Sequence, residues 1–162
     1  MLQIDIRHAT SEDAKLITDL IRCMVTEMAL YGGHAVNDSP EVWSSMAVLV
    51  KANSIRKDFI YLIASLRSPV QTTVGFAAAN LESPDNIFTA KKHLHIGAVY
   101  TDPNMRRQGI ARQLIQKALD WGGRMNADEA DLNVLVANPS RRLYERLGFQ
   151  PHEISLVKKL DR

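Results

Sequence analysis

The pattern of hydrophobic and polar positions over the first third of the chain predicts one strand followed by two helices. Residues 3–8 alternate polar and apolar side chains, as a half-buried strand does. Thr10 and Asp13 form a helix-start signal, after which apolar side chains recur every three or four residues up to Gly32. Pro40 opens a second pattern of this kind, which continues to about residue 50. Two amphipathic helices are therefore expected directly after the first strand.

From residue 58 onward, the period changes to that of β-strands. Two apolar runs at 58–66 and 70–81 are joined by residues 67–69, which predicts a hairpin. The remaining predicted elements are a strand at 93–101, a helix at 109–124, a strand at 131–136, a short helix between Asn138 and Gly148, and a strand at 154–160. This order predicts an α/β fold, with one domain over residues 1–162 and a mixed sheet flanked by helices.

Composition and charge exclude several classes of protein. The 162 residues are 46% hydrophobic and 23% charged, which is typical of one globular domain with a buried core. The formal net charge of +2 does not favour a nucleic-acid partner. Cys23 is the only cysteine, so no intramolecular disulfide can form, and we expect it to be a small buried side chain. No apolar run has membrane-spanning or signal length, so we expect no membrane partner and a cytoplasmic location.

The turn before the predicted helix at 109–124 has the features of an anion-binding site. The first N–H groups of a helix have no partners within the helix, so they can bind a phosphate. Gly109 and Ala111 are small, which allows a pyrophosphate to approach the backbone. Neither a Walker A loop nor a three-glycine dinucleotide fingerprint is present. Taken alone, the turn also fits an ordinary helix start. Positive charge comes from three arginines: Arg106, Arg107 and Arg112.

Two stretches of the chain together resemble the GNAT-type N-acetyltransferases. The first is Arg106-Arg107-Gln108-Gly109-Ile110-Ala111, which resembles the family's Arg/Gln-x-x-Gly-x-Gly/Ala signature. The second combines Leu132-Asn133-Val134, Asn138 and Leu143-Tyr144-Glu145-Arg146-Leu147-Gly148-Phe149. The two stretches occur in the family's order, and the resemblance spans roughly residues 58–160.

This resemblance implies a central, mostly antiparallel sheet and acetyl-CoA as a cosubstrate. The coenzyme would lie in a V-shaped opening between the strand that ends near Tyr100 and the strand at 132–136. The pantetheine arm would pair with the backbone of Ala98, Val99 and Tyr100. The pyrophosphate would accept hydrogen bonds from the amides of Gln108, Gly109, Ile110 and Ala111.

Asn138 and Tyr144 each have a structural and a functional interpretation. Asn138 precedes a proline and can cap a helix, whereas the matching family residue contacts the coenzyme. Tyr144 lies near an apolar stripe and can be a core tyrosine. In many relatives the matching tyrosine is a general acid that protonates the departing thiolate. In these relatives it also lies near the coenzyme sulfur, so the resemblance favours Tyr144 as a catalytic residue that contacts the coenzyme.

The general base is less obvious. An alkylammonium with a pKa of about 10.4 must lose a proton before it attacks, at a cost of about 4–5 kcal/mol at pH 7. Several relatives have a glutamate on the strand before the phosphate turn, but residues 91–100 contain no acid. His95 occupies a comparable position with His93 on the same face, and histidine suits this role. Both can also be ordinary strand histidines, and a metal site lacks a third ligand. Glu82 and Asp85 are the alternative acids.

Three functions are compatible with these features. The first is an enzyme, an acyltransferase that passes the acetyl group of acetyl-CoA directly to the primary amine of a small acceptor. The second is an acyl-CoA-binding regulator without turnover, since the expected glutamate is missing. The third is an enzyme that modifies a macromolecule. The near-neutral charge argues against tRNA as its acceptor, which leaves a peptide or protein N-terminus. Many family members dimerise, and the sequence leaves a homodimer open.

Overall fold

The computed structural model describes residues 3–67, 71–83, 92–158 and 160. The hairpin connection predicted at 67–69 therefore lies largely outside the described residues. The elements in chain order are β1 (Ile4–His8), α1 (Ala14–Met28), α2 (Pro40–Asn53), β2 (Phe59–Leu66), β3 (Thr72–Glu82), β4 (His93–Thr101), α3 (Ile110–Arg124), β5 (Glu129–Asp131) and α4 (Arg141–Arg146).

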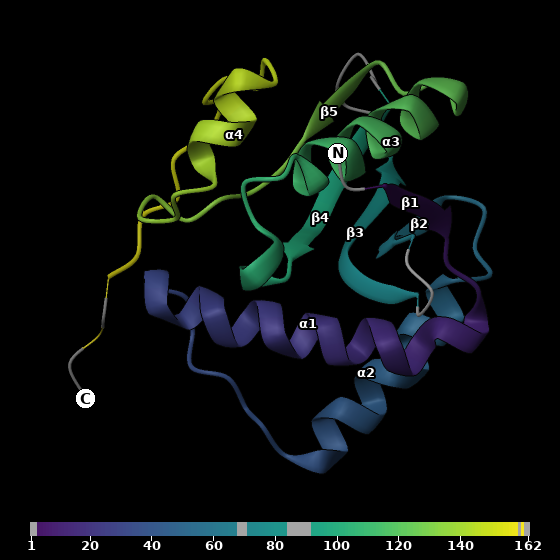
Figure 1. The fold of residues 1–162 in the computed structure, drawn as a ribbon. Helices are drawn as coiled ribbons and strands as arrows, with labels where there is room; N and C mark the ends of the chain where they lie inside the picture. Colours follow the sequence, from purple (N-terminus) through teal and green to yellow (C-terminus); the bar gives the residue numbers. More distant parts are fainter. Residues whose placement is uncertain (1–2, 68–70, 84–91, 159, 161–162) are drawn as a thin grey trace.

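Five strands form one mixed sheet in the order β1-β2-β3-β4-β5 (Figure 1). The first four strands pair antiparallel with their neighbours, and β5 runs parallel to β4. Helix α3 covers one face of the sheet, whereas α1 and α2 lie on the other (Figure 1). The predicted α/β fold with a mostly antiparallel sheet is therefore confirmed.

A hydrophobic core lies on each face of the sheet. On the α3 face, Leu114 and Ile115 pack in the same buried cluster as Leu62 and Leu94. On the opposite face, side chains of α1 and α2 form a second buried cluster with alternate residues of β2 and β3. Strands β2 and β3 are buried through most of their length because helices cover both faces. This burial explains why both strands are almost continuously apolar in sequence.

The start of α1 forms where the sequence predicts it. Asp13 accepts a hydrogen bond from the backbone N–H of Thr10 at 2.8 Å, which completes a capping box. Arg7 of β1 also pairs with Asp13, with 2.6 Å between Nη2 and Oδ1. The carboxylate of Asp13 thus links the first strand to the start of the first helix.

Two strand predictions in the last third of the chain are wrong. The strand expected at 131–136 is only Glu129–Asp131, and the residues after Asp131 leave strand geometry. The strand expected at 154–160 is absent from the described residues of that range, where Ile154 is 87% exposed. An alternating pattern forms a strand only where a neighbouring edge pairs with it and buries its apolar face. In the described part of the chain, residues 132–136 and 154–160 pair with no neighbouring strand.

The expectation that Cys23 is buried is also wrong, because its side chain is exposed. Ile17 and Met24 of α1 are directed toward the second core instead, with Ile17 fully buried there. Helical geometry places Cys23 beside Met24 but off the apolar stripe that faces the sheet.

Candidate functional site

Strands β4 and β5 pair over only three positions and then separate. His93 pairs with Glu129, Leu94 with Ala130, and His95 with Asp131. Strand β4 continues to Thr101, whereas the chain after β5 has no strand geometry. Among the described residues, this edge of β4 therefore has no neighbouring strand beyond His95. An unpaired strand edge offers backbone N–H and C=O groups to an extended ligand.

A β-bulge lies where the two strands begin to separate. The pairing of β3 with β4 shifts register between Ala78 and Ala79, which leaves Gly97 as an extra residue on β4. Ala98 and Tyr100 beyond the bulge lie against the core on the α1 face, and Val99 lies against the α3 core. The backbone of these three residues is expected to pair with the pantetheine arm. They pair with β3 on one side and have no described strand on the other.

The turn between β4 and α3 has an unusual backbone. Gly109, the N-cap residue of α3, has a φ of +79°, and Arg107 has a φ of 64°. Such turns direct successive N–H groups toward one concave point, where an anion can bind. A Cβ atom at Gly109 would meet nothing within 4 Å, so the space in front of this backbone is open. Ile110 begins α3 and is buried at 1% exposure, which anchors the turn.

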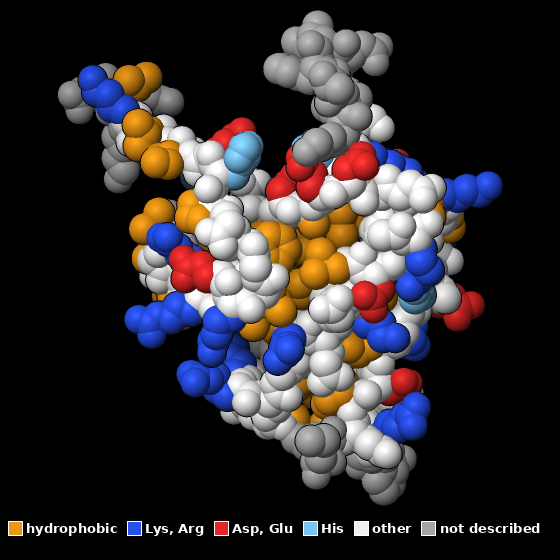
Figure 2. Space-filling view, turned by 90° about the horizontal axis from the view of Figure 1, so that it is seen from above, with side chains coloured by type: hydrophobic (Ala, Val, Ile, Leu, Met, Phe, Trp, Pro, Cys, Tyr) orange, Lys and Arg blue, Asp and Glu red, His pale blue; other side chains and the backbone are white. Residues whose placement is uncertain are grey.

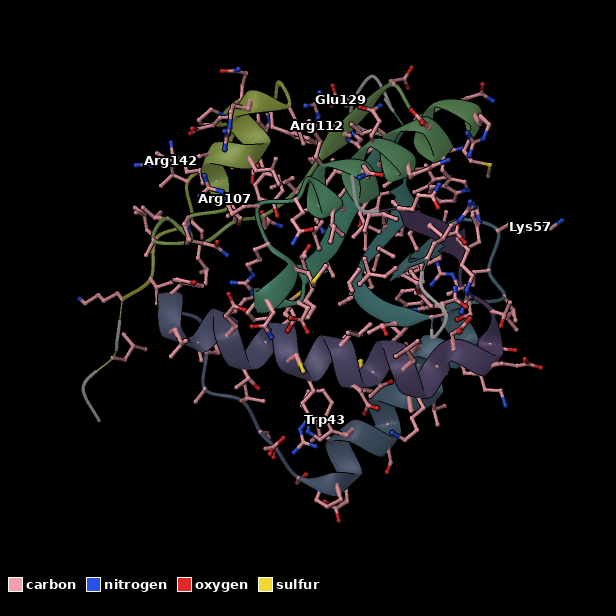
Figure 3. All side chains as sticks on the ribbon, viewed as in Figure 1. Trp43, Lys57, Arg107, Arg112, Glu129 and Arg142 are labelled. Carbon is pink, nitrogen blue, oxygen red and sulfur yellow. The ribbon has the colours of Figure 1, made fainter. Side chains whose placement is uncertain are left out.

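The three arginines at the turn have different surroundings. Arg106 forms an ion pair with Glu27 of α1, and its Nε donates a hydrogen bond to the Thr101 carbonyl at 3.1 Å. Arg107 and Arg112 are exposed, and no ion pair involves either within the described residues. Figure 3 shows both side chains extending from the turn and from the first part of α3. Arg106 is therefore engaged within the protein, while the other two are available to a ligand. Gln108 and Ala111 complete the turn and the first helical residues.

Asn138 has a structural role that leaves part of its side chain free. Its Oδ1 accepts hydrogen bonds from the backbone N–H of Ser140 at 2.9 Å and from the Ser140 hydroxyl at 2.7 Å. These contacts order the chain just before α4. Within the described part of the chain, its Nδ2 has no hydrogen-bond partner. The same residue can therefore order this turn and still donate to a ligand.

Tyr144 lies on α4 and packs against the core on the α3 face. Its ring meets that of Phe149 edge-on, with 6.2 Å between centroids. Burial raises the pKa of the Tyr144 hydroxyl, and a hydrogen bond with Ser140 partly opposes that rise. A tyrosine with a raised pKa keeps its proton at neutral pH, which a general acid requires. Both interpretations made from the sequence, a core tyrosine and a proton donor, thus fit this position.

Histidines and carboxylates gather at the point where β4 and β5 pair. Nδ1 of His95 lies 2.5 Å from Oδ1 of Asp131, and Nδ1 of His93 lies 3.2 Å from Oε1 of Glu129. The parallel register places each histidine directly beside its carboxylate. Sequence reasoning missed Asp131 because it looked for acids only on β4 and on the strand before it. The only available signal was that Asp131 opens the strand predicted at 131–136.

Of the alternative acids, Glu82 lies in the same cluster. It pairs with His93 across β3 and β4, and its Oε1 accepts a hydrogen bond from Nδ2 of Asn80 at 2.9 Å. Asp85 lies outside the described residues. Among the described residues, no group of three or more potential metal ligands occurs.

The face of the molecule drawn in Figure 2, seen from above the view of Figure 1, carries opposite charges at its margins. Figure 2 shows hydrophobic side chains exposed in the middle of this face, with Asp and Glu side chains along its upper border. Lys and Arg side chains gather at its lower left (Figure 2).

No helix in the described part of the chain is long and apolar enough to cross a membrane.

Comparisons with known proteins agree with this geometry. The chain matches the sequence profile of the "Acetyltransferase (GNAT) family" over residues 36–149. No curated protein matches it. A solved structure of a transcriptional regulator from Bacillus halodurans C-125 is similar at a TM-score of 0.75 and 20% identity, over 98% of this chain and 100% of that one.

Two further solved structures contain a coenzyme. Aminoglycoside N-acetyltransferase AAC(6')-Iy in complex with CoA aligns at a TM-score of 0.74 and 18% identity, over 99% of this chain and 96% of that chain. A predicted acetyltransferase from Clostridium acetobutylicum with acetyl-CoA aligns at 0.76 and 17%, over 97% and 96%. At these identities the similarity establishes the fold, and the sequence profile establishes the family. The resemblance noted in the sequence is therefore confirmed, and the chain belongs to the acetyltransferase (GNAT) family.

Proposed function

We propose that this protein is an acetyl-CoA-dependent N-acetyltransferase that transfers the acetyl group by direct attack of a primary amine on the thioester. One observation carries the proposal. The edge of β4 that has no described neighbour runs between the turn before α3, with its left-handed Arg107 and Gly109, at one end and the pair His95–Asp131 at the other. A coenzyme with a pyrophosphate, an extended arm and a reactive thioester requires these three features in this order.

The residues present fit the coenzyme. The N–H groups at the start of α3 and the exposed Arg107 and Arg112 would bind its phosphates. The backbone from Ala98 to Tyr100 would pair with its extended arm, and Nδ2 of Asn138 would add a hydrogen bond. Arg106 would act differently from its neighbours, because its guanidinium holds the turn to α1.

Two side chains of this protein would move protons. When bound, acetyl-CoA supplies the acetyl group. His95 would accept a proton from the amine, directly or through water, as the bond between nitrogen and the carbonyl carbon forms. Tyr144 would give its proton to sulfur as the carbon–sulfur bond breaks. Replacing His95 by Gln is expected to lower acetylation while leaving coenzyme binding unchanged.

The carboxylates beside the histidines favour a cationic acceptor. Glu82, Glu129 and Asp131 lie around His93 and His95, and Coulomb attraction between carboxylates and an ammonium group raises its local concentration. We propose a small amine in the cytoplasm, where acetyl-CoA is available, and no nucleic-acid or membrane partner. A peptide N-terminus is the alternative acceptor.

Thermal unfolding with and without acetyl-CoA tests the proposal, with free CoA and ATP as controls. A concentration a hundredfold above Kd adds about 2.7 kcal/mol to the free energy of unfolding. For a domain of this size, we expect Tm to rise by roughly 5–10 °C with both coenzymes and not with ATP. If neither coenzyme raises Tm, the turn before α3 is only a helix start and the proposal fails.

A second experiment separates an enzyme from a regulator. Release of free thiol from acetyl-CoA is followed with spermidine, kanamycin, lysine and a short peptide as acceptors. Thiol release that depends on one of these amines supports an enzyme. Coenzyme binding without thiol release from any of them favours the regulator.

A further inference from the structure

We propose that Asp131 is a positioning residue, which fixes the ring of His95 so that Nε2 accepts the proton of the attacking amine above Gly97. The proposal rests on the proposed function, because it assigns a partner to the base of that reaction. Neither residue of this pair lies on α3 or in the phosphate-binding turn, so the pair can be tested apart from coenzyme binding.

The contact between the two side chains determines which ring nitrogen carries the proton. Nδ1 of His95 lies 2.5 Å from Oδ1 of Asp131, well within hydrogen-bond distance. An ionised carboxylate has only acceptor oxygens, so Nδ1 of the ring must be the donor. In a neutral imidazole, a hydrogen on Nδ1 leaves the lone pair on Nε2. The carboxylate therefore selects the tautomer in which Nε2 can act as a base.

The free nitrogen faces the part of β4 that has no neighbouring strand. A Cβ atom built on Gly97 would lie 3.8 Å from Nε2 of His95 and 3.7 Å from its Cδ2. Gly97 is the extra residue of the β-bulge, and it is exposed. Because Gly97 has no side chain, the space beside Nε2 stays open to a ligand. Nε2 thus lies where the unpaired edge of β4 begins.

Strand pairing holds this arrangement from both sides. His95 lies in register with Asp131 of β5 on one side and with Asn80 of β3 on the other. Other titratable groups around the ring are His93, Glu129 and Glu82, which occupy the neighbouring row of the same three strands. Oδ2 of Asp131 lies 3.7 Å from Nδ1 of His93, too far for a hydrogen bond.

The proton balance of the step is simple. The proton that leaves the amine binds Nε2, the hydrogen on Nδ1 stays in its bond to Asp131, and the charged ring later returns the extra proton to water. Asp131 stays ionised throughout and touches no reacting atom. Its contribution is the orientation of the ring and stabilisation of the positive charge that forms on it.

Nitrogen NMR of protein labelled with ¹⁵N-histidine tests the tautomer without any substrate. At a pH where the His95 ring is neutral, we expect Nδ1 to be protonated and Nε2 unprotonated in the natural protein. Asp131→Asn is expected to produce a mixture of tautomers at His95, whereas Glu129→Gln on the same strand leaves His95 unchanged. A proton on Nε2 of His95 in the natural protein, or no change with Asp131→Asn, would overturn the proposal.

A double-mutant cycle tests the consequence for the rate, with acetyl-CoA and the acceptor that gives thiol release. We expect Asp131→Asn to lower kcat about 10- to 100-fold, as removal of a group that orients a histidine does elsewhere, with KM for acetyl-CoA unchanged. In a His95→Gln background, the same change is expected to have no further effect. An equal loss in both backgrounds would show that Asp131 does not act through His95.

The proposed function and the positioning role of Asp131 can be disproved separately. If no acceptor yields thiol, the proposed function fails while the NMR measurement still decides the role of Asp131 toward His95. If acetylation occurs but the His95 tautomer does not depend on Asp131, the proposed function stands and the positioning role is wrong.

Discussion

At the residue scale, Gly109 combines a rare backbone conformation with open space. Its φ of +79° lies in the left-handed region, where a side chain costs about 1–2 kcal/mol. A Cβ atom there would meet no protein atom within 4 Å, so packing does not require glycine at this position. The conformation and the open space together fit a backbone that a bulky anion approaches closely.

Replacing Gly109 by Ala is therefore expected to weaken coenzyme binding about tenfold, because the added methyl group would occupy the space in front of the turn. The measurement is the Kd of acetyl-CoA by titration calorimetry. Gly32→Ala is the matched control, since Gly32 has a φ of +87° and also meets nothing within 4 Å. Both variants should lose similar stability, and an equal loss of affinity would contradict the prediction.

Tyr144 allows a test that separates catalysis from packing. Tyr144→Phe is expected to lower kcat by about 10²-fold or more, the range for a general acid, with the Kd of acetyl-CoA unchanged. Tyr61→Phe is the control, because burial also raises the pKa of the Tyr61 hydroxyl in the second core. A similar fall in kcat in both variants, or none in Tyr144→Phe, would argue against the proton-donor role.

The same two variants have a predicted effect on stability at high pH. Burial raises the pKa of both hydroxyls in the folded state, so the unfolded chain loses these protons first as pH rises. The free energy of unfolding then falls as pH rises above about 10, the value for unperturbed tyrosine. Each Phe variant should reduce this alkaline loss, which urea unfolding between pH 9 and 11 measures. If the fall in the free energy of unfolding with pH is the same in the Phe variants as in the natural protein, the two hydroxyls reach solvent in the folded state.

At the element scale, the ion pair between Arg106 and Glu27 joins the turn before α3 to the end of α1. The side chains of Arg106 and Glu27 are 38% and 25% exposed, so the pair is partly shielded from water. Arg107 follows directly in sequence and remains exposed. Adjacent arginines of one turn therefore have different expected roles, one within the protein and one toward a ligand.

Substituting each arginine by Met tests this division. Arg106→Met is expected to lower Tm by a few degrees, because it breaks the contact with α1 and removes the cation that pairs with Glu27. Arg107→Met is expected to leave Tm nearly unchanged and to raise the Kd of acetyl-CoA several-fold. The measurements are thermal unfolding and calorimetry on both variants. If Arg106→Met raises the Kd of acetyl-CoA and Arg107→Met does not, Arg106 is released from Glu27 when the coenzyme binds.

The elements also show which parts of the fold and site the sequence can reveal. The periodicity of α1 and α3 and the apolar runs of β2 to β4 depend on burial within each segment, so local patterns predict them. The residues at 106–111 are contiguous in sequence, so a local motif can mark them, and their role in binding an anion stays a prediction. Asp131 was missed because its nearness to His95 follows from the pairing of β4 with β5, which no local pattern encodes. The length of β5 was overestimated for the same reason.

At the scale of the whole molecule, the chain after α4 leaves apolar side chains in water. Ile154 is 87% exposed and Leu156 is 90% exposed, in a segment with the alternation of a strand. Val157 and Leu160 are also more than four-fifths exposed, at 86% and 81%. Clusters of exposed apolar side chains are uncommon on monomeric proteins and mark surfaces of association. We therefore predict that two copies of the chain associate through this segment.

Sedimentation velocity over a concentration series tests this self-association. The natural protein is expected to shift from monomer to dimer as concentration rises, and the double variant Ile154→Ser, Leu156→Ser is expected to remain a monomer. Its Tm at low concentration should match that of the natural monomer, because these side chains are almost fully exposed within one chain. The control is Leu30→Ser, Ile55→Ser, which removes apolar side chains that are 80% and 78% exposed elsewhere on the molecule and should leave association intact. A natural protein that stays monomeric at every concentration would contradict the prediction. A double variant with a lower monomer Tm would instead indicate that the segment packs within its own chain.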